Sequence, residues 1–213
     1  MKITRDECML YAITDRVLMG QERFLELVEE SLRGGVTMLQ LREKELPERE
    51  FIKVAMDVHE ITRRYNVPLI INDNPIVALM AEAEGVHVGQ DDMDVRQARE
   101  ILGYNKIIGA TAHNLEEALI AEDIGADYLG VGAAFGSRTK LDAKVIKQGE
   151  YERICARVTI PVVAIGGINE ENMAELHGRG LSGIAMIGAI YGAQNVAEAA
   201  RRLRWQAARI LVP

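Results

Sequence analysis

The feature that most constrains the fold is a regular alternation of short apolar segments with longer amphipathic segments along the whole chain. Continuous apolar runs of this kind are typical of strands covered on both faces, as in a parallel sheet. Eight segments are rich in β-branched residues and short enough to be strands: 9–14, 36–42, 68–73, 85–89, 106–111, 127–132, 161–167 and 183–188. The alternation therefore predicts repeated strand–helix units around a parallel sheet.

The segments between these strands have apolar residues at helical spacing. Segment 24–35 ends in Gly34-Gly35, which is a helix stop signal. Segments 49–66, 114–126 and 169–180 are also predicted as helices, the last with Asn169 as N-cap, and a final helix is expected over 201–212.

Eight strand–helix units without a change in composition predict one α/β domain over residues 1–213, a closed (β/α)₈ TIM barrel. Such barrels run from about 200 to 250 residues, so 213 residues fit one with short loops. No GxGxxG motif follows the first strand, which disfavours a dinucleotide-binding sheet.

Charge and cysteine usage exclude several classes of protein. A formal net charge of -7 disfavours a nucleic-acid binder or a basic membrane-surface protein. The two cysteines form no CxxC pattern, which disfavours a zinc site or a disulfide framework. Charged residues 5–7 interrupt any apolar stretch near the start, and no run approaches the roughly 20 apolar residues that a membrane span needs. We therefore expect a cytoplasmic protein that acts on small molecules, and a homo-oligomer stays possible.

Polar residues at the end of the second strand are the first candidates for a functional site. Gln40, Arg42 and Lys44 fall on one side of the strand because side chains alternate with a period of two. A solvated strand end is the alternative reading. The interior of such a barrel is normally filled with Val, Ile and Leu, so three polar residues on this side favour a function.

Two aspartates follow neighbouring strands and form a candidate metal site. Asp73 ends the third strand and Asp92 follows the fourth. Adjacent strands lie about 4.8 Å apart, so the two carboxylates could share one Mg²⁺ and leave coordination sites for phosphate. The alternative is that Asn72-Asp73-Asn74 only forms a turn and caps a helix. Beside Arg42 and Lys44, the pair predicts a metal–diphosphate site.

Loops after the later strands are candidate phosphate sites. Ser137, Thr139 and Lys140 place hydroxyls and a cation in a glycine-containing loop, although an ordinary exposed loop explains them equally well. Gly167 and Gly188 follow the seventh and eighth strands, where this fold commonly binds phosphate through backbone N–H groups. The sequence thus predicts two anion-binding regions, one metal-assisted and one built from backbone.

The histidines do not by themselves predict a catalytic group. His87 lies within the fourth strand and His113 after the fifth, and each fits a structural hydrogen-bonding role as well as that of a base. His59 and His177 fall in predicted helices and are expected to be surface or packing residues.

In nine segments that include most of the predicted site residues, the chain resembles the thiamine phosphate synthase family. The matching segments come in family order and extend from residue 9 to about 200. They are YAITDR (11–16), GGVTMLQLREK (34–44), IIND (70–73), GVHVGQDD (85–92), GATAHNLEEA (109–118), DYLGVGAAF (127–135), TKLDA (139–143), PVVAIGGI (161–168) and GIAMIGAI (183–190).

The resemblance implies a reaction that composition could not reveal. A hydroxymethylpyrimidine diphosphate loses pyrophosphate, and the ring nitrogen of a thiazole phosphate captures the resulting carbocation to give thiamine phosphate. It also implies roles for individual residues. The pyrimidine diphosphate would be held by Gln40, Arg42, Lys44 and Asn72, and Mg²⁺ by Asp73 and Asp92. Lys140 would neutralise the departing pyrophosphate and, with Arg42 and Lys44, supply the catalytic charge. The thiazole phosphate would be held by Thr139, Gly167 and Gly188.

The chain departs from the commonest family pattern at a few positions. Two of these substitutions, at Thr111 and Ser137, keep the hydroxyl of the family residue, so both positions stay in the predicted substrate-binding set. The departures are Asn74 for Arg, Thr111 for Ser, Ala133 for Pro, Gly136-Ser137 for Pro-Thr and Gly188 for a frequent Ser.

Two other functions remain as alternatives. One is a thiazole tautomerase-like isomerase, a related branch whose members carry a catalytic histidine in the sixth-strand segment. That segment reads GVGAAFGSRTK here and has none. The other is a non-catalytic paralogue that binds a phosphorylated ligand, which would have little reason to keep Asp73, Asp92, Lys44 and Lys140 together.

Overall fold

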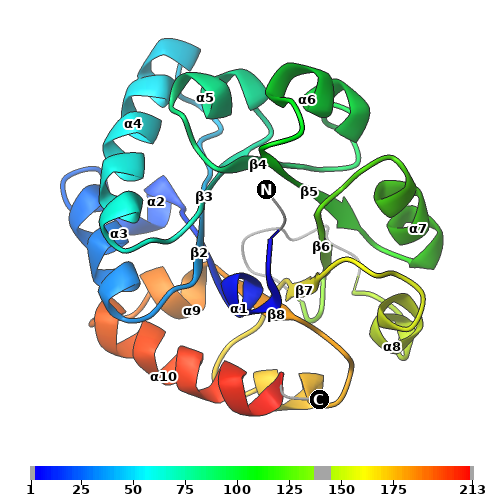
Figure 1. Cartoon of the computed structure of the whole chain (residues 1–213). Coiled ribbons are helices and arrows are strands. Elements are labelled where there is room, and N and C mark those ends of the chain that lie inside the picture. The colour runs from blue at the N-terminus through cyan, green and yellow to red at the C-terminus, as the bar shows by residue number, and fades with distance from the viewer. Residues whose placement is uncertain (1–2, 137–144, 212–213) are drawn as a thin grey trace.

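Eight parallel strands close into a barrel in the computed structural model, which describes residues 3–136 and 145–211. Each strand pairs with the next along the chain, and β8 pairs with β1 (Figure 1). The strands are β1 (Leu10–Ile13), β2 (Met38–Leu41), β3 (Leu69–Asn72), β4 (Gly85–Val88), β5 (Ile107–Ala112), β6 (Tyr128–Gly132), β7 (Val162–Ile165) and β8 (Gly183–Met186). Each overlaps a segment that the sequence predicts as a strand, and the predicted (β/α)₈ barrel is confirmed.

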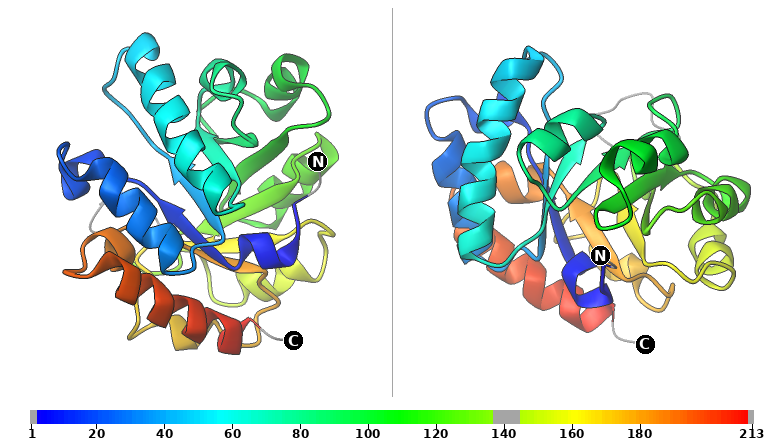
Figure 2. Two further views of the ribbon diagram at one scale, coloured as in Figure 1. Left: turned by 60° about the vertical axis from the view of Figure 1, so that its left-hand side comes forward. Right: turned by 45° about the horizontal axis from the view of Figure 1, so that its top comes forward.

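Helices surround the barrel as an outer layer (Figures 1 and 2). Three of them match the predicted helices 24–35, 49–66 and 114–126, and each stops two or three residues earlier than predicted. Among the described residues, no helix has both the length and the apolar character needed to cross a membrane. The helices are α1 (Arg5–Cys8), α2 (Arg16–Met19), α3 (Phe24–Arg33), α4 (Glu48–Arg64), α5 (Pro75–Met80), α6 (Val95–Leu102), α7 (Leu115–Asp123), α8 (Glu150–Cys155), α9 (Gly188–Tyr191) and α10 (Val196–Ile210), with the 3₁₀ helix η1 (Met173–Leu176).

The last helix closes the outer layer by packing against α3, as Figure 2 shows. It begins earlier than the predicted 201–212 because the side chain of Asn195 accepts a hydrogen bond from the N–H of Glu198 and caps it. Gly34 allows the close approach, since a Cβ at this position would lie 2.4 Å from the carbonyl oxygen of Ala197. The Gly-Gly pair therefore serves helix packing as well as helix termination.

The predicted helix over 169–180 is wrong, because only the four residues of η1 are helical there. Asn169 is not a helix N-cap, because η1 starts after Asn172; its Oδ1 instead accepts hydrogen bonds from the N–H groups of Glu171 and Asn172 in the turn before η1. Gly178 and Gly180 have φ values of +73° and +79°, which end any regular helix. The apolar spacing was correct for Met173 and Leu176, which are buried, but it extends over one turn only.

The N-terminal segment belongs to the barrel interior. Ile3 and Cys8 join the apolar cluster inside the barrel, which is separate from the cluster between strands and helices. A Cβ at Gly183 would lie 1.8 Å from the carbonyl oxygen of Cys8, so glycine is required where this segment meets β8. Because α1 lies at the amino ends of the strands, ligands must reach the interior from the carboxyl ends.

Candidate functional site

Charged side chains lie close together at the carboxyl ends of β2 and β3. These two strands are neighbours in the barrel (Figure 1). Lys44 Nζ lies 2.5 Å from Oδ2 of Asp73, and Asn72 Nδ2 donates to Oδ1 of the same carboxylate at 2.7 Å. Asp73 has φ of +62°, an uncommon backbone conformation for a residue other than glycine. The last residue of β3 and a residue in the loop after β2 thus hold one carboxylate between them.

Asp92 lies near this carboxylate, in the turn after β4. Its Oδ2 accepts a hydrogen bond from the N–H of Gly89 at 3.0 Å. Burial raises the pKa of Asp73 above its usual value; Lys44 opposes the rise, and the neighbouring Asp92 carboxylate adds to it. This mutual influence places the two predicted metal ligands close to each other.

The donor set fits a hard cation. Mg²⁺ is commonly held by one or two carboxylates together with water and substrate phosphates. Asp73 and Asp92 supply such a pair, and the described residues contain no cluster of three or more acidic, histidine or cysteine side chains. A metal bound here would therefore take its remaining ligands from water, from other oxygen groups or from the substrate.

The two charged residues between Gln40 and Lys44 differ in their partners. Glu43 forms a two-pronged ion pair with Arg16, with separations of 2.6–3.0 Å, and the Arg16 guanidinium lies 4.3 Å above the ring of Phe24. Arg42 is half-buried, and its guanidinium has no hydrogen bond or ion pair within the described ranges. Glu43 is thus paired with Arg16, whereas the guanidinium of Arg42 stays available to a ligand.

A chain of polar side chains crosses the barrel interior below this rim. Gln40 Nε2 lies 2.6 Å from the hydroxyl of Tyr11, which lies 2.8 Å from the hydroxyl of Tyr128. His87 is 3.0 Å from Tyr128 through Nδ1 and 3.0 Å from Thr111 Oγ1 through Nε2. Burial lowers the pKa of His87 to about 4, so its ring is neutral at pH 7. Of the two roles considered for His87, the structure shows the hydrogen-bonding one, with Tyr128 and Thr111 as partners.

The two tyrosines were not predicted from the sequence as site residues. Tyr128 has room because its neighbours on the adjacent strand are small: a Cβ at Gly109 would lie 2.1 Å from its ring. The sequence does contain one indication, because Tyr128 lies on an inward-facing position opposite Gly109. A glycine within a strand often marks a place where another group approaches closely.

In the described ranges, the rim above β6 and β7 is formed by backbone. The N–H of Phe135 donates to the carbonyl oxygen of Gly166 at 3.0 Å. Gly167 has φ of +66°, and a Cβ there would lie 2.4 Å from the carbonyl oxygen of Gly136. Both the conformation and the close approach require glycine at position 167.

Gly188 is the first residue of α9 and is exposed. The N–H groups in the first turn of a helix have no acceptor within the helix, so they are available to an anion. Ser137, Thr139 and Lys140 lie outside the described residues. The predicted site residues that the structure describes therefore all lie at the carboxyl ends of the strands, with acidic and basic groups over β2–β4 and glycines over β7 and β8.

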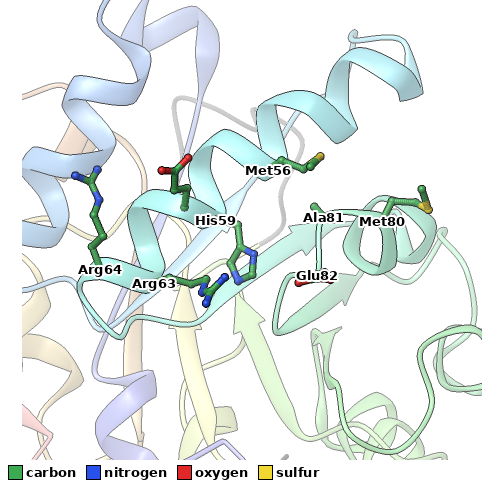
Figure 3. Close-up of a pocket in the computed structure, with 8 residues that line it drawn as sticks. Met56, His59, Arg63, Arg64, Met80, Ala81 and Glu82 are labelled. Carbon is green, nitrogen blue, oxygen red and sulfur yellow. The ribbon is translucent and has the colours of Figure 1, made fainter.

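A separate groove of about 620 Å³ lies on the outer layer between α4 and α5. Figure 3 shows side chains of α4 and α5 lining it, among them Met56, His59 and Met80. His59 is held by Glu84, with Nε2 3.1 Å from Oε1, in agreement with the packing role expected for it. This groove contains none of the predicted site residues.

Comparison with known proteins identifies the family. The sequence profile of the thiamine monophosphate synthase family matches residues 10–190. The thiamine-phosphate synthase of Clostridium acetobutylicum is 47% identical over 192 residues, covering 90% of this chain and 91% of that protein. The thiamine-phosphate synthase of Caldanaerobacter subterraneus subsp. tengcongensis is 49% identical over 189 residues, with 88% of each chain covered.

A solved structure agrees with this assignment. Thiamine phosphate pyrophosphorylase from Pyrococcus furiosus superposes with a TM-score of 0.90 at 42% sequence identity, covering 98% of this chain and 99% of that one. Fold, sequence and the order of the matching segments all lead to the same family. This chain belongs to the thiamine-phosphate synthase family of transferases.

Proposed function

We propose that the chain joins 4-amino-2-methyl-5-hydroxymethylpyrimidine diphosphate to 4-methyl-5-(2-phosphooxyethyl)thiazole, giving thiamine phosphate and pyrophosphate, with Mg²⁺ as cofactor. One observation carries the proposal: Lys44, Asp73 and Asp92 come together at adjacent strand ends beside Arg42, directly above a polar interior. Such an arrangement suits the pyrimidine diphosphate. The cations and a metal would contact the diphosphate oxygens, and the uncharged pyrimidine ring would lie against the polar interior.

Asp73 and Asp92 are the proposed metal ligands. Both oxygens of Asp73 are already engaged, one by Lys44 and one by Asn72. Binding of a cation by Asp73 would thus release Lys44, whose ammonium could then reach the diphosphate. The metal would supply charge neutralisation on the diphosphate oxygens.

The residues of the chain would act mainly by position and charge. The carbon–oxygen bond to the pyrimidine methylene breaks, and its electron pair leaves with the pyrophosphate. Arg42, Lys44 and Lys140 would stabilise the negative charge that develops on this leaving group. The thiazole nitrogen then supplies the electron pair of the new carbon–nitrogen bond, so no covalent intermediate with the protein is needed.

The pyrimidine ring would lie over Gln40 and Asn72, on the side of Thr111. Gln40 is 4% exposed, and one N–H of its amide is donated to Tyr11. A ligand would therefore contact Oε1 or the second N–H of the amide. The thiazole phosphate would be held by the backbone of Gly167 and Gly188, together with Ser137 and Thr139. The two phosphorylated substrates thus occupy opposite sides of one rim.

The alternatives are less well supported. The described part of the β6 segment, from Tyr128 to Gly136, contains no histidine, and a tautomerase needs neither the acidic pair nor the cations. A non-catalytic binding protein would not need a half-buried carboxylate whose pKa is raised by burial and by a second carboxylate beside it.

Incubation of the purified protein with both substrates and Mg²⁺ tests the proposal. Thiamine phosphate and pyrophosphate should form in equal amounts, and neither should form when the thiazole phosphate is replaced by its dephosphorylated alcohol at the same low concentration. Stoichiometric binding of both substrates without product would instead establish a binding protein, and isomerisation of the thiazole substrate alone would establish a tautomerase.

A further inference from the structure

The hydrogen-bonded chain inside the barrel has a direction. Tyr11 and Tyr128 are fully buried, so each hydroxyl hydrogen must be donated within the chain. Gln40 Nε2 donates to Tyr11, which leaves Tyr11 to donate to Tyr128. Tyr128 can then donate only to Nδ1 of His87, and the ring of His87 must carry its hydrogen on Nε2.

The direction determines what both ends of the chain offer to a ligand. Nε2–H of His87 donates to Oγ1 of Thr111, so the hydroxyl hydrogen of Thr111 is left to point elsewhere. At the other end, Gln40 donates one of its two N–H groups to Tyr11, and its Oε1 is left as an acceptor on the other side of the same amide. Gln40 therefore presents an acceptor and Thr111 a donor.

Gln40 and Thr111 are coupled because the row of hydrogen bonds between them can run in only two directions with every bond made. If the amide of Gln40 were turned over, every donor and acceptor would reverse, and Thr111 would become an acceptor. An isolated glutamine could offer either group to a ligand, since its amide rotates freely between them. Here, rotation of the amide requires four hydrogen bonds to change together.

We propose that Tyr128 is a positioning residue that determines specificity: through Tyr11 it holds Gln40 as an acceptor for the exocyclic amino group of the pyrimidine, and through His87 it holds Thr111 as a donor. This inference rests on the proposed function for the identity of the ring, whereas the direction of the chain does not depend on it. Tyr128 packs edge-on against Tyr11 with ring centroids 5.9 Å apart, and it also lies against the ring of His87. Phenylalanine would keep both ring contacts and remove only the hydroxyl that joins the two halves.

The test uses ligands that bind without reacting. The probes are the monophosphate ester of the same pyrimidine alcohol and its analogue in which the exocyclic amino group is replaced by hydrogen. The wild-type protein should bind the amino form about tenfold more tightly, which is the upper range for one net hydrogen bond. In Tyr128→Phe this preference should shrink to less than about threefold, because Gln40 is free to turn over.

A merely structural role predicts a different result, namely equal weakening for both probes. Tyr191→Phe is the matched control, because Tyr191 is also buried and its hydroxyl bonds to Ser31 in the outer layer. It should keep the wild-type preference. Tyr11→Phe provides a second variant should Tyr128→Phe fail to fold: it cuts the link to Gln40 but leaves the bond from Tyr128 to His87 intact.

Nitrogen-15 NMR of the ring of His87 in the free protein reads the direction without any ligand. The wild type and Tyr11→Phe should show hydrogen on Nε2, and Tyr128→Phe should lose this exclusive tautomer. Hydrogen on Nδ1 in the wild type, or an unchanged preference for the amino probe in both Tyr128→Phe and Tyr11→Phe, would overturn the inference. A wild-type protein with the predicted tautomer but no transfer activity would contradict the proposed function and leave the direction of the chain intact.

Discussion

The rim of the barrel is built in two different ways on its two sides. Over β2, β3 and β4 it consists of ionised side chains, with Lys44 bound to Asp73 and Asp92 close by. Over β6 and β7, the part of the rim that the structure describes is made of backbone, with the loops in contact at positions where a Cβ would collide. Side chains can exchange partners when a ligand arrives, whereas a backbone surface of this kind is fixed in advance.

The difference corresponds to two chemical tasks. A leaving diphosphate gains negative charge during the reaction, so the groups around it must respond to a change in charge. A phosphate that only anchors a substrate keeps its charge, and fixed N–H groups are sufficient for it. We therefore assign bond breaking to the ionic side of the rim and anchoring to the glycine side.

Removal of the divalent metal should have the largest effect. Without a cation, Asp73 and Asp92 would repel the diphosphate, so turnover should be abolished in excess chelator and restored by added Mg²⁺. Product formation is measured with the same protein before and after readdition. Full activity in excess chelator, with Mg²⁺ shown to be absent, would contradict the metal assignment.

Lys140→Ala should have the next largest effect, although this residue lies outside the described part of the structure. Loss of a positioned cation at the leaving group should lower kcat on the order of 10²–10³, the range found when one electrostatic donor is removed. Binding of the thiazole phosphate should change little. Wild-type kcat, or a defect confined to thiazole affinity, would assign Lys140 to the glycine side or to neither side.

Asp92→Asn should give a smaller effect that concerns the metal. The change removes one unit of charge near the cation, worth about 1–4 kcal/mol at a separation of about 4 Å, so the Mg²⁺ concentration for half-maximal rate should rise at least about fivefold. Asp91→Asn is the matched control, because Asp91 is the exposed neighbour in the same turn. Thermal melting should be unchanged in both variants, and an equal shift in both would mean that only the general charge of the turn matters.

Much of the fold could be predicted because it depends on local pattern. Eight apolar runs indicated eight strands, and alternation within the second strand separated Gln40, Arg42 and Lys44 from Glu43. The pattern failed over 169–180, where two glycines with positive φ leave only one turn of helix. Apolar spacing reports which residues are buried, but not how far a helix continues.

The site was less predictable because its partners meet only when the barrel closes. Lys44 and Asp73 were each assigned to a different ligand, yet in this structure they bind each other. Tyr11 and Tyr128 are 117 residues apart, and neither belongs to a motif that suggests a hydrogen bond between them. Contacts of this kind depend on strand register and on the small residues opposite, which no single segment of the sequence reveals.

The division of the rim is tested most directly by measuring KM for each substrate in one variant from each side. Lys44→Met removes the ammonium from the ionic side, and Gly167→Ala places a Cβ where φ is +66° and the carbonyl oxygen of Gly136 is 2.4 Å away. Gly103→Ala controls for backbone strain, because Gly103 has φ of +72° with no atom within 4 Å of the added Cβ. This strain costs about 1–3 kcal/mol in stability wherever it occurs.

We expect Lys44→Met to raise KM for the pyrimidine diphosphate about tenfold and leave KM for the thiazole phosphate unchanged, and Gly167→Ala to do the reverse. Gly103→Ala should lower the melting temperature without changing either KM. An equal rise in both KM values in each of the two site variants would contradict the division of the rim into a side for bond breaking and a side for anchoring.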